Sequence, residues 1–321
     1  MIKKIGLIGF GKIGKLRYDL LKKIKLAQIL SVSDIKKVNI KNLNYIRNYN
    51  KIISDKEISH IFICTTNNLN NKIILAALKN NKKVFCEKPP CINRSELDKL
   101  NKLPIKYKKN LFVSFNHRTH ESVIKIKKTL KKNILGKVIW VRGRYGKKID
   151  NNLKKDWRLK KRISGGGILI DQGIHLIDLI IYLFKLKPSN IHSLLSSSFL
   201  GKKLIEDNAF LQFRDTNKKI DVSIQSTMAN WRYLFSLEIF LSKGQIILNG
   251  LKTPSGSYLP EKLTIKRKNS KVFFEKNYRE DNSFLIETNK FLENANSYNF
   301  KSNEKQLNRV MNIIFKAYAN F

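Results

Sequence analysis

The feature that most constrains the fold is the stretch 5–14, an apolar run that leads into the pattern G-x-G-x-x-G at Gly9, Gly11 and Gly14. Residues 15–24 carry leucine and isoleucine at helical spacing, so the pattern has the strand-turn-helix context of a dinucleotide-binding loop. The first glycine permits the tight turn, the second lets the backbone approach a pyrophosphate, and the third allows close packing of helix on strand. A tight turn that binds nothing is the competing interpretation, and the context favours a dinucleotide site.

Asp34 strengthens this prediction. It follows an expected strand at 29–33 and lies twenty residues beyond Gly14, where an acidic side chain can bind the adenosine ribose hydroxyls. Because a carboxylate repels a 2′-phosphate, Asp34 favours NAD. Lys36 and Lys37 follow after one intervening residue and keep NADP open as an alternative.

Strands alternate with helices up to about residue 116. Further buried-type strands are expected at 58–67, 83–86 and 111–115. This alternation predicts a doubly wound parallel sheet. Beyond residue 118 the expected elements are mainly strands separated by short turns, which predicts an α/β region with a mostly antiparallel sheet. We therefore predict two domains, 1–118 and 119–321, with the last helix, about 304–319, as a candidate to pack back on the first domain.

Composition limits the possible partners. Hydrophobic residues make up 42% and aromatic residues 10%, as in a globular protein. The net charge of +40 would attract nucleic acid, acidic membranes or anionic substrates. Lysine is however scattered along the whole chain together with abundant asparagine and isoleucine, and no base-reading motif occurs. The charge is therefore interpreted as a compositional background, and no nucleic-acid partner is expected.

The chain is expected to be soluble and cytoplasmic. Three cysteines without a C-x-x-C pattern indicate reduced thiols. The first residues open directly into a strand, so a signal peptide is not expected. The longest apolar helix, 168–184, contains three ionisable residues and is too short and too charged to span a membrane.

A corner at Glu87-Lys88-Pro89 follows the expected strand 83–86. Proline cannot donate to a strand ladder and biases the residue before it toward extended geometry. Lys88 is therefore predicted to lie at the carboxyl end of a strand, the edge where open α/β sheets bind ligands. The Lys88–Pro89 bond is predicted to be cis, a low-cost state only before proline.

Asp171, His175 and Asp178 are spaced at i, i+4 and i+7, which predicts that they share one face of the helix 168–184. A carboxylate one turn from a histidine can orient the ring and support its protonated form. We interpret Asp171 and His175 as chemical and Asp178 as structural. A metal site is not predicted, because a second histidine or a cysteine at ligand spacing is missing.

The glycine pattern, the Glu87-Lys88-Pro89 corner and Gly166-Gly167 followed by D-x-x-x-H-x-x-D at 171–178 resemble the Gfo/Idh/MocA oxidoreductase family in order and spacing. The resemblance implies a Rossmann dinucleotide-binding domain followed by an α/β substrate and oligomerisation domain with a large open sheet. It also implies an NAD(P)-dependent sugar dehydrogenase or reductase that acts on CH–OH groups, as a homodimer or homotetramer.

The resemblance also implies roles for single residues. Lys88 would bind the reacting hydroxyl or carbonyl, His175 would act as general acid or base, and Asp171 would orient the substrate; which of Lys88 and His175 transfers the proton stays open. The residues expected to bind the cofactor are Gly9, Phe10, Gly11, Lys12, Ile13, Gly14, Asp34, Thr65, Thr66, Asn67, Glu87 and Lys88. Those expected to bind the substrate are Asn116, Arg118, Trp157, Arg158, Asp171 and His175. Asn70 departs from the pattern, since many members have a histidine there.

The substrate is predicted only as a class. Segments at 207–210, 235–240 and 250–258 resemble members associated with nucleotide sugars and surface polysaccharides, and basic residues at 158–162 could meet a diphosphate. Our hypothesis is a nucleotide-activated sugar, with a free sugar or inositol as the alternative. Two other classes stay open, an NAD-dependent glycosidase of the same fold and a non-catalytic dinucleotide-binding protein.

Overall fold

The computed structural model describes the chain except residues 41–42, 150–155, 202–204, 255–257, 270–271, 294–299 and 320. Its contacts divide the chain into two compact units. The first unit comprises Met1–Asn116 and Phe284–Asn303, and the second comprises His117–Ser283 and Glu304–Phe321. Each unit is described by itself.

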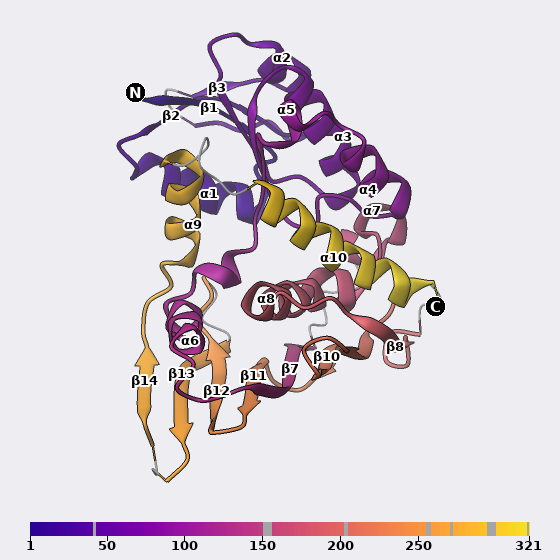
Figure 1. The fold of residues 1–321 in the computed structure, drawn as a ribbon. Coiled ribbons are helices and arrows are strands. Elements are labelled where there is room, and N and C mark those ends of the chain that lie inside the picture. The colour runs from indigo at the N-terminus through magenta and orange to yellow at the C-terminus, as the bar shows by residue number, and fades with distance from the viewer. Residues whose placement is uncertain are drawn as a thin grey trace. The chain divides into compact units, whose positions relative to one another are not determined.

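A six-stranded sheet forms the centre of the first unit, in the order β3-β2-β1-β4-β5-β6. Figure 1 labels its strands β1, β2 and β3. The strands are β1 (Lys3–Ile8), β2 (Ala27–Ser33), β3 (Asn44–Tyr45), β4 (His60–Ile63), β5 (Lys83–Cys86) and β6 (Leu111–Val113). All of the pairings are parallel. The order reverses between β1 and β4, which is the switch point of a dinucleotide-binding sheet. The predicted doubly wound parallel sheet is confirmed.

Both faces of this sheet are buried, because successive strand residues enter different cores. Phe62 packs with Ile5 and Phe85 in one apolar core, while its neighbours Ile61 and Ile63 pack in another. The helices of the unit are α1 (Lys12–Lys22), α2 (Tyr49–Ser54), α3 (Asn67–Lys79), α4 (Arg94–Asn101), α5 (Ile105–Lys108) and α9 (Ser283–Glu293). A sheet buried on both faces explains why its strands read as apolar runs.

The unit boundaries differ from the sequence-based domains at the C-terminal helices. Residues 284–303 were expected in the second domain, but Phe291 and Leu292 of α9 lie in the core that contains Phe62 and Phe85. The last helix, α10 (Phe300–Tyr318), begins in the first unit, which extends to Asn303, and continues in the second, which includes Glu304–Phe321. These assignments depend on contacts between segments far apart in the sequence.

An eight-stranded sheet forms the second unit, in the order β14-β13-β12-β11-β7-β10-β9-β8. Its strands are β7 (Val138–Lys148), β8 (Ser189–Ser196), β9 (Asn208–Asp215), β10 (Ile220–Asn230), β11 (Leu234–Leu241), β12 (Gly244–Leu251), β13 (Tyr258–Arg267) and β14 (Phe274–Tyr278). All neighbours are antiparallel except β7 and β10. The predicted large, mostly antiparallel sheet is confirmed.

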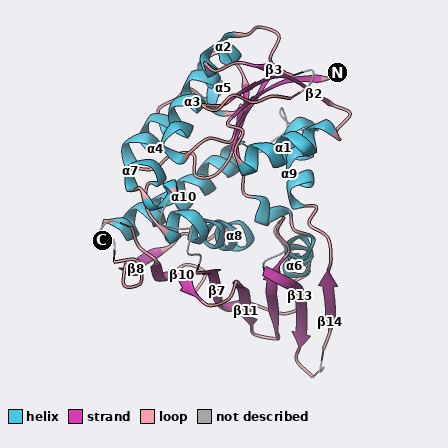
Figure 2. Ribbon diagram, turned by 180° about the vertical axis from the view of Figure 1, so that it is seen from behind, coloured by secondary structure: helices cyan, strands magenta, loops and turns pink. Residues whose placement is uncertain are grey.

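Helices cover one side of this large sheet. They are α6 (Glu121–Lys131), α8 (Ile174–Phe184) and α10, and in the described part of the chain no helix covers the other side (Figure 2). The short helix α7 (Lys161–Ser164) precedes a π-helical turn at Leu169–Gly173 that runs into α8. One helical stretch, Lys161–Phe184, is long and apolar enough to cross a membrane, but 78% of its most apolar window is buried within the protein. Packing accounts for its apolar character.

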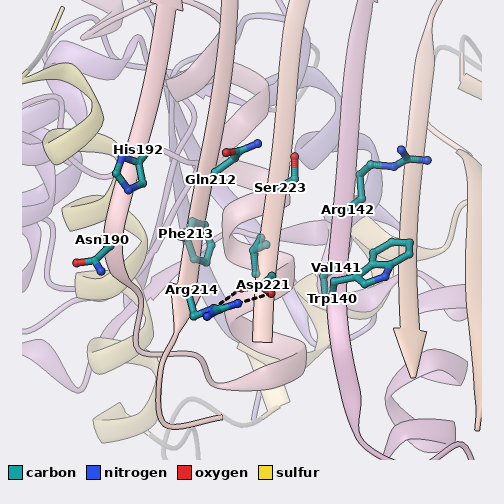
Figure 3. Close-up of a pocket in the computed structure, with 11 residues that line it drawn as sticks. Trp140, Val141, Arg142, Asn190, His192, Gln212, Phe213, Arg214, Asp221 and Ser223 are labelled. Atoms are coloured by element: carbon teal, nitrogen blue, oxygen red, sulfur yellow. Dashed lines mark hydrogen bonds and ion pairs between the residues drawn. The ribbon is translucent and has the colours of Figure 1, made fainter. Parts of the chain in front are cut away.

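The uncovered side of the sheet carries an open groove of about 480 Å³ (Figure 3). Arg214 is ion-paired with Asp221 in this groove. Along each strand the alternate residues point to the other, buried side, where Gly143 meets Leu176 of α8. The residues that line the groove are Trp140, Val141, Arg142, Asn190, His192, Gln212, Phe213, Arg214, Asp221, Val222 and Ser223.

Candidate active site

The glycine loop joins β1 to α1 with the geometry that a dinucleotide requires. Gly9 has a φ of +93°, which favours glycine. A Cβ on Gly14 would lie 2.1 Å from the carbonyl oxygen of Gly9, so helix and loop approach closely. A Cβ on Gly11 would meet no heavy atom within 4 Å. The loop therefore leaves open space beside the start of α1, where the backbone N–H groups favour an anion.

Asp34 is fixed against this loop. Its Oδ2 accepts a hydrogen bond from the Phe10 N–H at 2.6 Å, and its Oδ1 accepts one from the Lys36 N–H at 2.9 Å. The Tyr45 hydroxyl donates to the Asp34 carbonyl oxygen at 2.9 Å. The carboxylate is thus held at the edge of the glycine loop, which fits an adenosine ribose, and the chemistry of this set of residues fits a bound NAD(P).

Thr65, Thr66 and Asn67 follow β4 at the same edge of the sheet. β4 ends at Ile63, and α3 begins at Asn67. The Thr65 Oγ1 donates to the Oδ1 of Asn70 at 2.8 Å. The loop lies against Gly9, since a Cβ there would be 2.5 Å from the carbonyl oxygen of the residue before Thr65.

The Lys88 corner lies directly after β5. The Glu87 N–H donates to the Ile63 carbonyl oxygen at 3.0 Å, which continues the sheet ladder, and the Lys88–Pro89 bond is cis as predicted. The Glu87 carboxylate accepts a hydrogen bond from the Arg17 Nε at 2.8 Å. Glu87 was expected to bind the cofactor, and the structure adds an ion-pair partner for it that sequence reasoning missed.

Arg17 of α1 is completely buried beneath this corner. Besides Glu87, its guanidinium donates to the Oε2 of Glu287 at 2.7 Å, and it lies 4.4 Å from the centre of the Phe85 ring. Further acceptors are Ser114 Oγ, Thr288 Oγ1 and the Phe284 carbonyl oxygen. Burial raises the pKa of the Glu287 carboxyl, and the Arg17 charge opposes that rise. A single cation thus joins α1, the ends of β5 and β6, and α9.

Asp171 lies in the π-helical turn before α8, in the second unit. Its Oδ1 is 3.7 Å from the Nε of Arg158, which also pairs with Asp156 at 3.2 Å. The Arg158 guanidinium lies over the Trp157 ring at 4.6 Å. The structure therefore brings together three of the residues expected to bind the substrate, Asp171, Trp157 and Arg158. Turns of π-helix are frequent at functional sites.

His175 of α8 lies in an aromatic cluster. Its ring stacks on that of His117, with centroids 4.1 Å apart and an angle of 18° between the planes. The ring centroid of Tyr145 of β7 lies 6.5 Å from that of His175, and the Tyr145 ring packs edge-on against Tyr258. Burial, and then the negative charge of Asp171, raise the pKa of Tyr145. Sequence reasoning did not select His117, although it lies between Asn116 and Arg118, two residues expected to bind the substrate.

Arg118 and Asp178 form a bidentate ion pair inside the second unit. The Arg118 Nε donates to the Asp178 Oδ2 at 2.8 Å, and Gln306 of α10 donates to the other oxygen at 3.1 Å. Burial raises the pKa of Asp178, and Arg118 opposes that rise. The contacts of Asp178 are with protein side chains, which agrees with its interpretation as a structural residue. Arg118, expected at the substrate, is engaged with Asp178, and Asn116 is buried at the start of a 3-10 turn.

The glycines before Asp171 approach protein atoms. A Cβ on Gly167 would lie 2.0 Å from the Glu206 carbonyl oxygen, and one on Gly166 would lie 2.1 Å from the Tyr318 hydroxyl. The buried Glu206 carboxylate accepts hydrogen bonds from the Gly167 N–H at 2.8 Å and from Tyr318 at 2.7 Å. These glycines therefore allow tight packing ahead of α8. Among the described residues no group of three or more His, Cys, Asp or Glu could hold a metal ion.

The expected site residues fall into two groups. The glycine loop, Asp34, the residues 65–67 and the Lys88 corner belong to the first unit. Asp171 and His175 belong to the second unit. Within each group the side chains lie on neighbouring elements.

Comparison with known proteins identifies both units. A family model described as an oxidoreductase family with an NAD-binding Rossmann fold matches residues 3–115. A model of the GFO/IDH/MocA C-terminal domain matches residues 123–247. The myo-inositol 2-dehydrogenase of Thermotoga maritima is 25% identical over 304 residues, 92% of this chain and 88% of that protein. The levoglucosan dehydrogenase of Pseudarthrobacter phenanthrenivorans is 33% identical over 143 residues, 44% of this chain and 36% of that protein.

Solved structures show the same fold. An NAD binding oxidoreductase from Klebsiella pneumoniae has a TM-score of 0.83 at 16% identity, over 100% of this chain and 98% of that one. A variant of a 3-ketoreductase from Actinomadura kijaniata, in complex with TDP-benzene and NADP, has a TM-score of 0.82 at 15% identity, over 98% and 96%. A levoglucosan dehydrogenase bound to NADH and levoglucosan has a TM-score of 0.79 at 19% identity, over 100% and 98%. The chain belongs to the Gfo/Idh/MocA family of NAD(P)-dependent oxidoreductases.

Proposed function

We propose that this oxidoreductase transfers hydride between NAD and a secondary hydroxyl or carbonyl of a sugar or cyclic polyol. The observation that carries the proposal is Lys88, which follows β5 at the same carboxyl edge of the parallel sheet at which the glycine loop follows β1 and Asp34 follows β2. When bound, the nicotinamide accepts or donates the hydride. In this proposal the loop 9–14, Asp34, residues 65–67 and Glu87 hold the cofactor, with Asp34 favouring NAD over NADP.

Lys88, His175 and Asp171 share the remaining chemistry. Oxidation of an alcohol requires the hydroxyl proton to leave as the hydride departs, and a positioned amine or imidazole can take it. In reduction, a protonated Lys88 or His175 polarises the carbonyl. Asp171, Trp157 and Arg158 orient the substrate, and Asn116 lines its approach. Arg118 contributes by holding α8 through Asp178.

For the substrate we favour a free sugar or inositol over a nucleotide-activated sugar. The relative that spans 92% of this chain is named a myo-inositol dehydrogenase. Arg158, a candidate contact for a diphosphate, is already paired with Asp156 and Asp171. A nucleotide sugar remains the second candidate because Lys160, Lys161 and Arg162 next to it are exposed.

A substrate screen tests the proposal. Reduced-nicotinamide absorbance is followed with myo-inositol, levoglucosan, hexoses and their UDP, TDP and GDP derivatives, with product chromatography alongside. Net NADH formation with a free polyol supports the favoured substrate class, and a requirement for the nucleotide supports the second. Glycoside cleavage without net NADH would instead indicate a glycosidase, and cofactor binding without any turnover would indicate a non-catalytic protein.

Replacement of Lys88 tests its role. We expect Lys88→Ala to bind NADH with near-normal affinity, measured by fluorescence titration, while kcat falls by about 10²–10⁴-fold, the range for loss of a proton-transfer group. Lys79→Ala, at the exposed end of α3, is the control and should retain both properties. Full turnover of the Lys88 variant would remove this residue from the mechanism.

We also propose that the enzyme is cytoplasmic and forms a homodimer or homotetramer through the uncovered side of the large sheet. The three cysteines form no disulfide, in keeping with a reducing compartment. Strands of that sheet carry exposed apolar side chains at Leu194, Phe210 and Phe240, which suits an interface between subunits. Sedimentation analysis of the purified protein measures the assembly state.

A further inference from the structure

Asn70, in the first turns of α3, is completely buried and makes three side-chain hydrogen bonds. Its Nδ2 donates to the Pro89 carbonyl oxygen at 2.8 Å and to the Glu87 carbonyl oxygen at 3.3 Å. Its Oδ1 accepts from the Thr65 Oγ1 at 2.8 Å. A buried amide that lost these partners would destabilise the protein by the cost of its desolvation, so the site requires this hydrogen-bonding group.

The two carbonyl groups that Asn70 binds lie on either side of Lys88. The Glu87 carbonyl belongs to the peptide group before Lys88, and the Pro89 carbonyl belongs to the residue after it. One side-chain amide therefore fixes the main chain on both sides of a single residue. The direction in which the Lys88 side chain leaves the backbone depends on this geometry.

The corner is fixed a second time through Glu87. The carboxylate of Glu87 binds Arg17 at 2.8 Å, from the side of α1, while Asn70 binds the main chain from the side of α3. Thr65, the third partner of Asn70, stands in the loop after β4 that lies against the glycine turn. Asn70 thus connects the Lys88 backbone with the loop expected to contact the cofactor.

We propose that Asn70 is a positioning residue for Lys88, which it serves by holding the Glu87 and Pro89 carbonyl groups. The inference rests on the proposed function, in which Lys88 contacts the reacting oxygen. Aspartate is isosteric with asparagine but carries no N–H, so at position 70 it would direct its oxygens at two carbonyl oxygens. The corner would then move, and a displacement of about 1 Å at a reacting group can cost on the order of 100-fold in rate.

The test compares Asn70→Asp with Asn71→Asp. Asn71 is also buried in α3, and its Nδ2 donates to the carbonyl oxygen of Glu96, a residue of α4, at 3.1 Å. We expect Asn70→Asp to lower kcat about 100-fold on the substrate found by the screen, with the KM for NAD changed less than about 3-fold. Asn71→Asp should keep kcat within about 3-fold of the parent enzyme. Asn70→Ala replaces Asn70→Asp if the latter does not fold.

Hydrogen-exchange mass spectrometry of the peptide 84–92 gives a readout that needs no substrate. Faster exchange in the Asn70 variant than in the Asn71 variant supports the inference, and equal exchange overturns it. Equal losses of kcat in the two variants, or a loss confined to the KM for NAD, also overturn it. If the parent enzyme transfers hydride to or from none of the compounds in the screen, the proposed function fails, and the exchange comparison alone decides whether Asn70 fixes the corner.

Discussion

The buried ion pairs of Arg17 lead to a prediction with a distinctive pH dependence. Arg17→Met keeps an unbranched side chain of similar length but removes the cation that faces Glu87 and Glu287. The Glu287 side chain is 3% exposed, so water cannot replace the lost Arg17 charge as its partner unless the structure changes. We expect the variant to be strongly destabilised at pH 7 and much less so at pH 5.

The magnitude follows from the protonation of Glu287. Breaking a buried ion pair by removing one partner typically costs about 3–5 kcal/mol. The variant can limit this cost by protonating the carboxyl, which from an unfolded pKa of about 4.3 requires about 3.7 kcal/mol at pH 7 and about 1 kcal/mol at pH 5. Because the folded variant then holds a proton that the unfolded chain has released, its stability falls as the pH rises above about 4.3.

Urea unfolding followed by circular dichroism at both pH values provides the measurement. Arg17→Met should lose about 4 kcal/mol at pH 7 and about 2.7 kcal/mol less at pH 5, and Glu287→Gln in the same protein should remove most of that difference. Arg94→Met is the control, since the exposed Arg94–Asp98 pair should contribute less than about 1 kcal/mol. A pH-independent loss in the Arg17 variant would refute the electrostatic explanation.

Two further predictions concern the glycine loop and the core of the second unit. Gly14→Ala should abolish NAD binding or folding, because its methyl group would lie 2.1 Å from a carbonyl oxygen. Gly11→Ala should keep the parent melting temperature and weaken NAD binding about 10-fold or more, as measured by calorimetry. Tight NAD binding by both variants would contradict the loop assignment. Asp178→Ala should lower the free energy of unfolding by about 3–5 kcal/mol, because it removes the buried carboxylate that pairs with Arg118. A loss below 1 kcal/mol in urea would show that this pair contributes little to stability.

The local features of the site could be predicted from the sequence. The turn at Gly9, the position of Lys88 after β5 and the cis bond before Pro89 depend on one or two neighbouring residues, whose conformational limits hold in any fold. The strand and helix periods likewise predicted the parallel and antiparallel sheets. The relative orientation of Asp171 and Asp178 was harder to predict, because the spacing argument assumes a regular α-helix and Asp171 lies in a π-helical turn at 169–173.

Only the tertiary structure decided which partners these residues have. Arg17 and Glu287 are 270 residues apart in the chain, and no local pattern indicates that α9 joins the first unit to complete that pair. The stacking of His117 on His175 and the hydrogen bonds from Asn70 to the Lys88 corner depend in the same way on packing between separate elements. A sequence determines the conformations and chemistry that each residue can offer, whereas the contacts that orient a side chain arise only when distant segments are brought together.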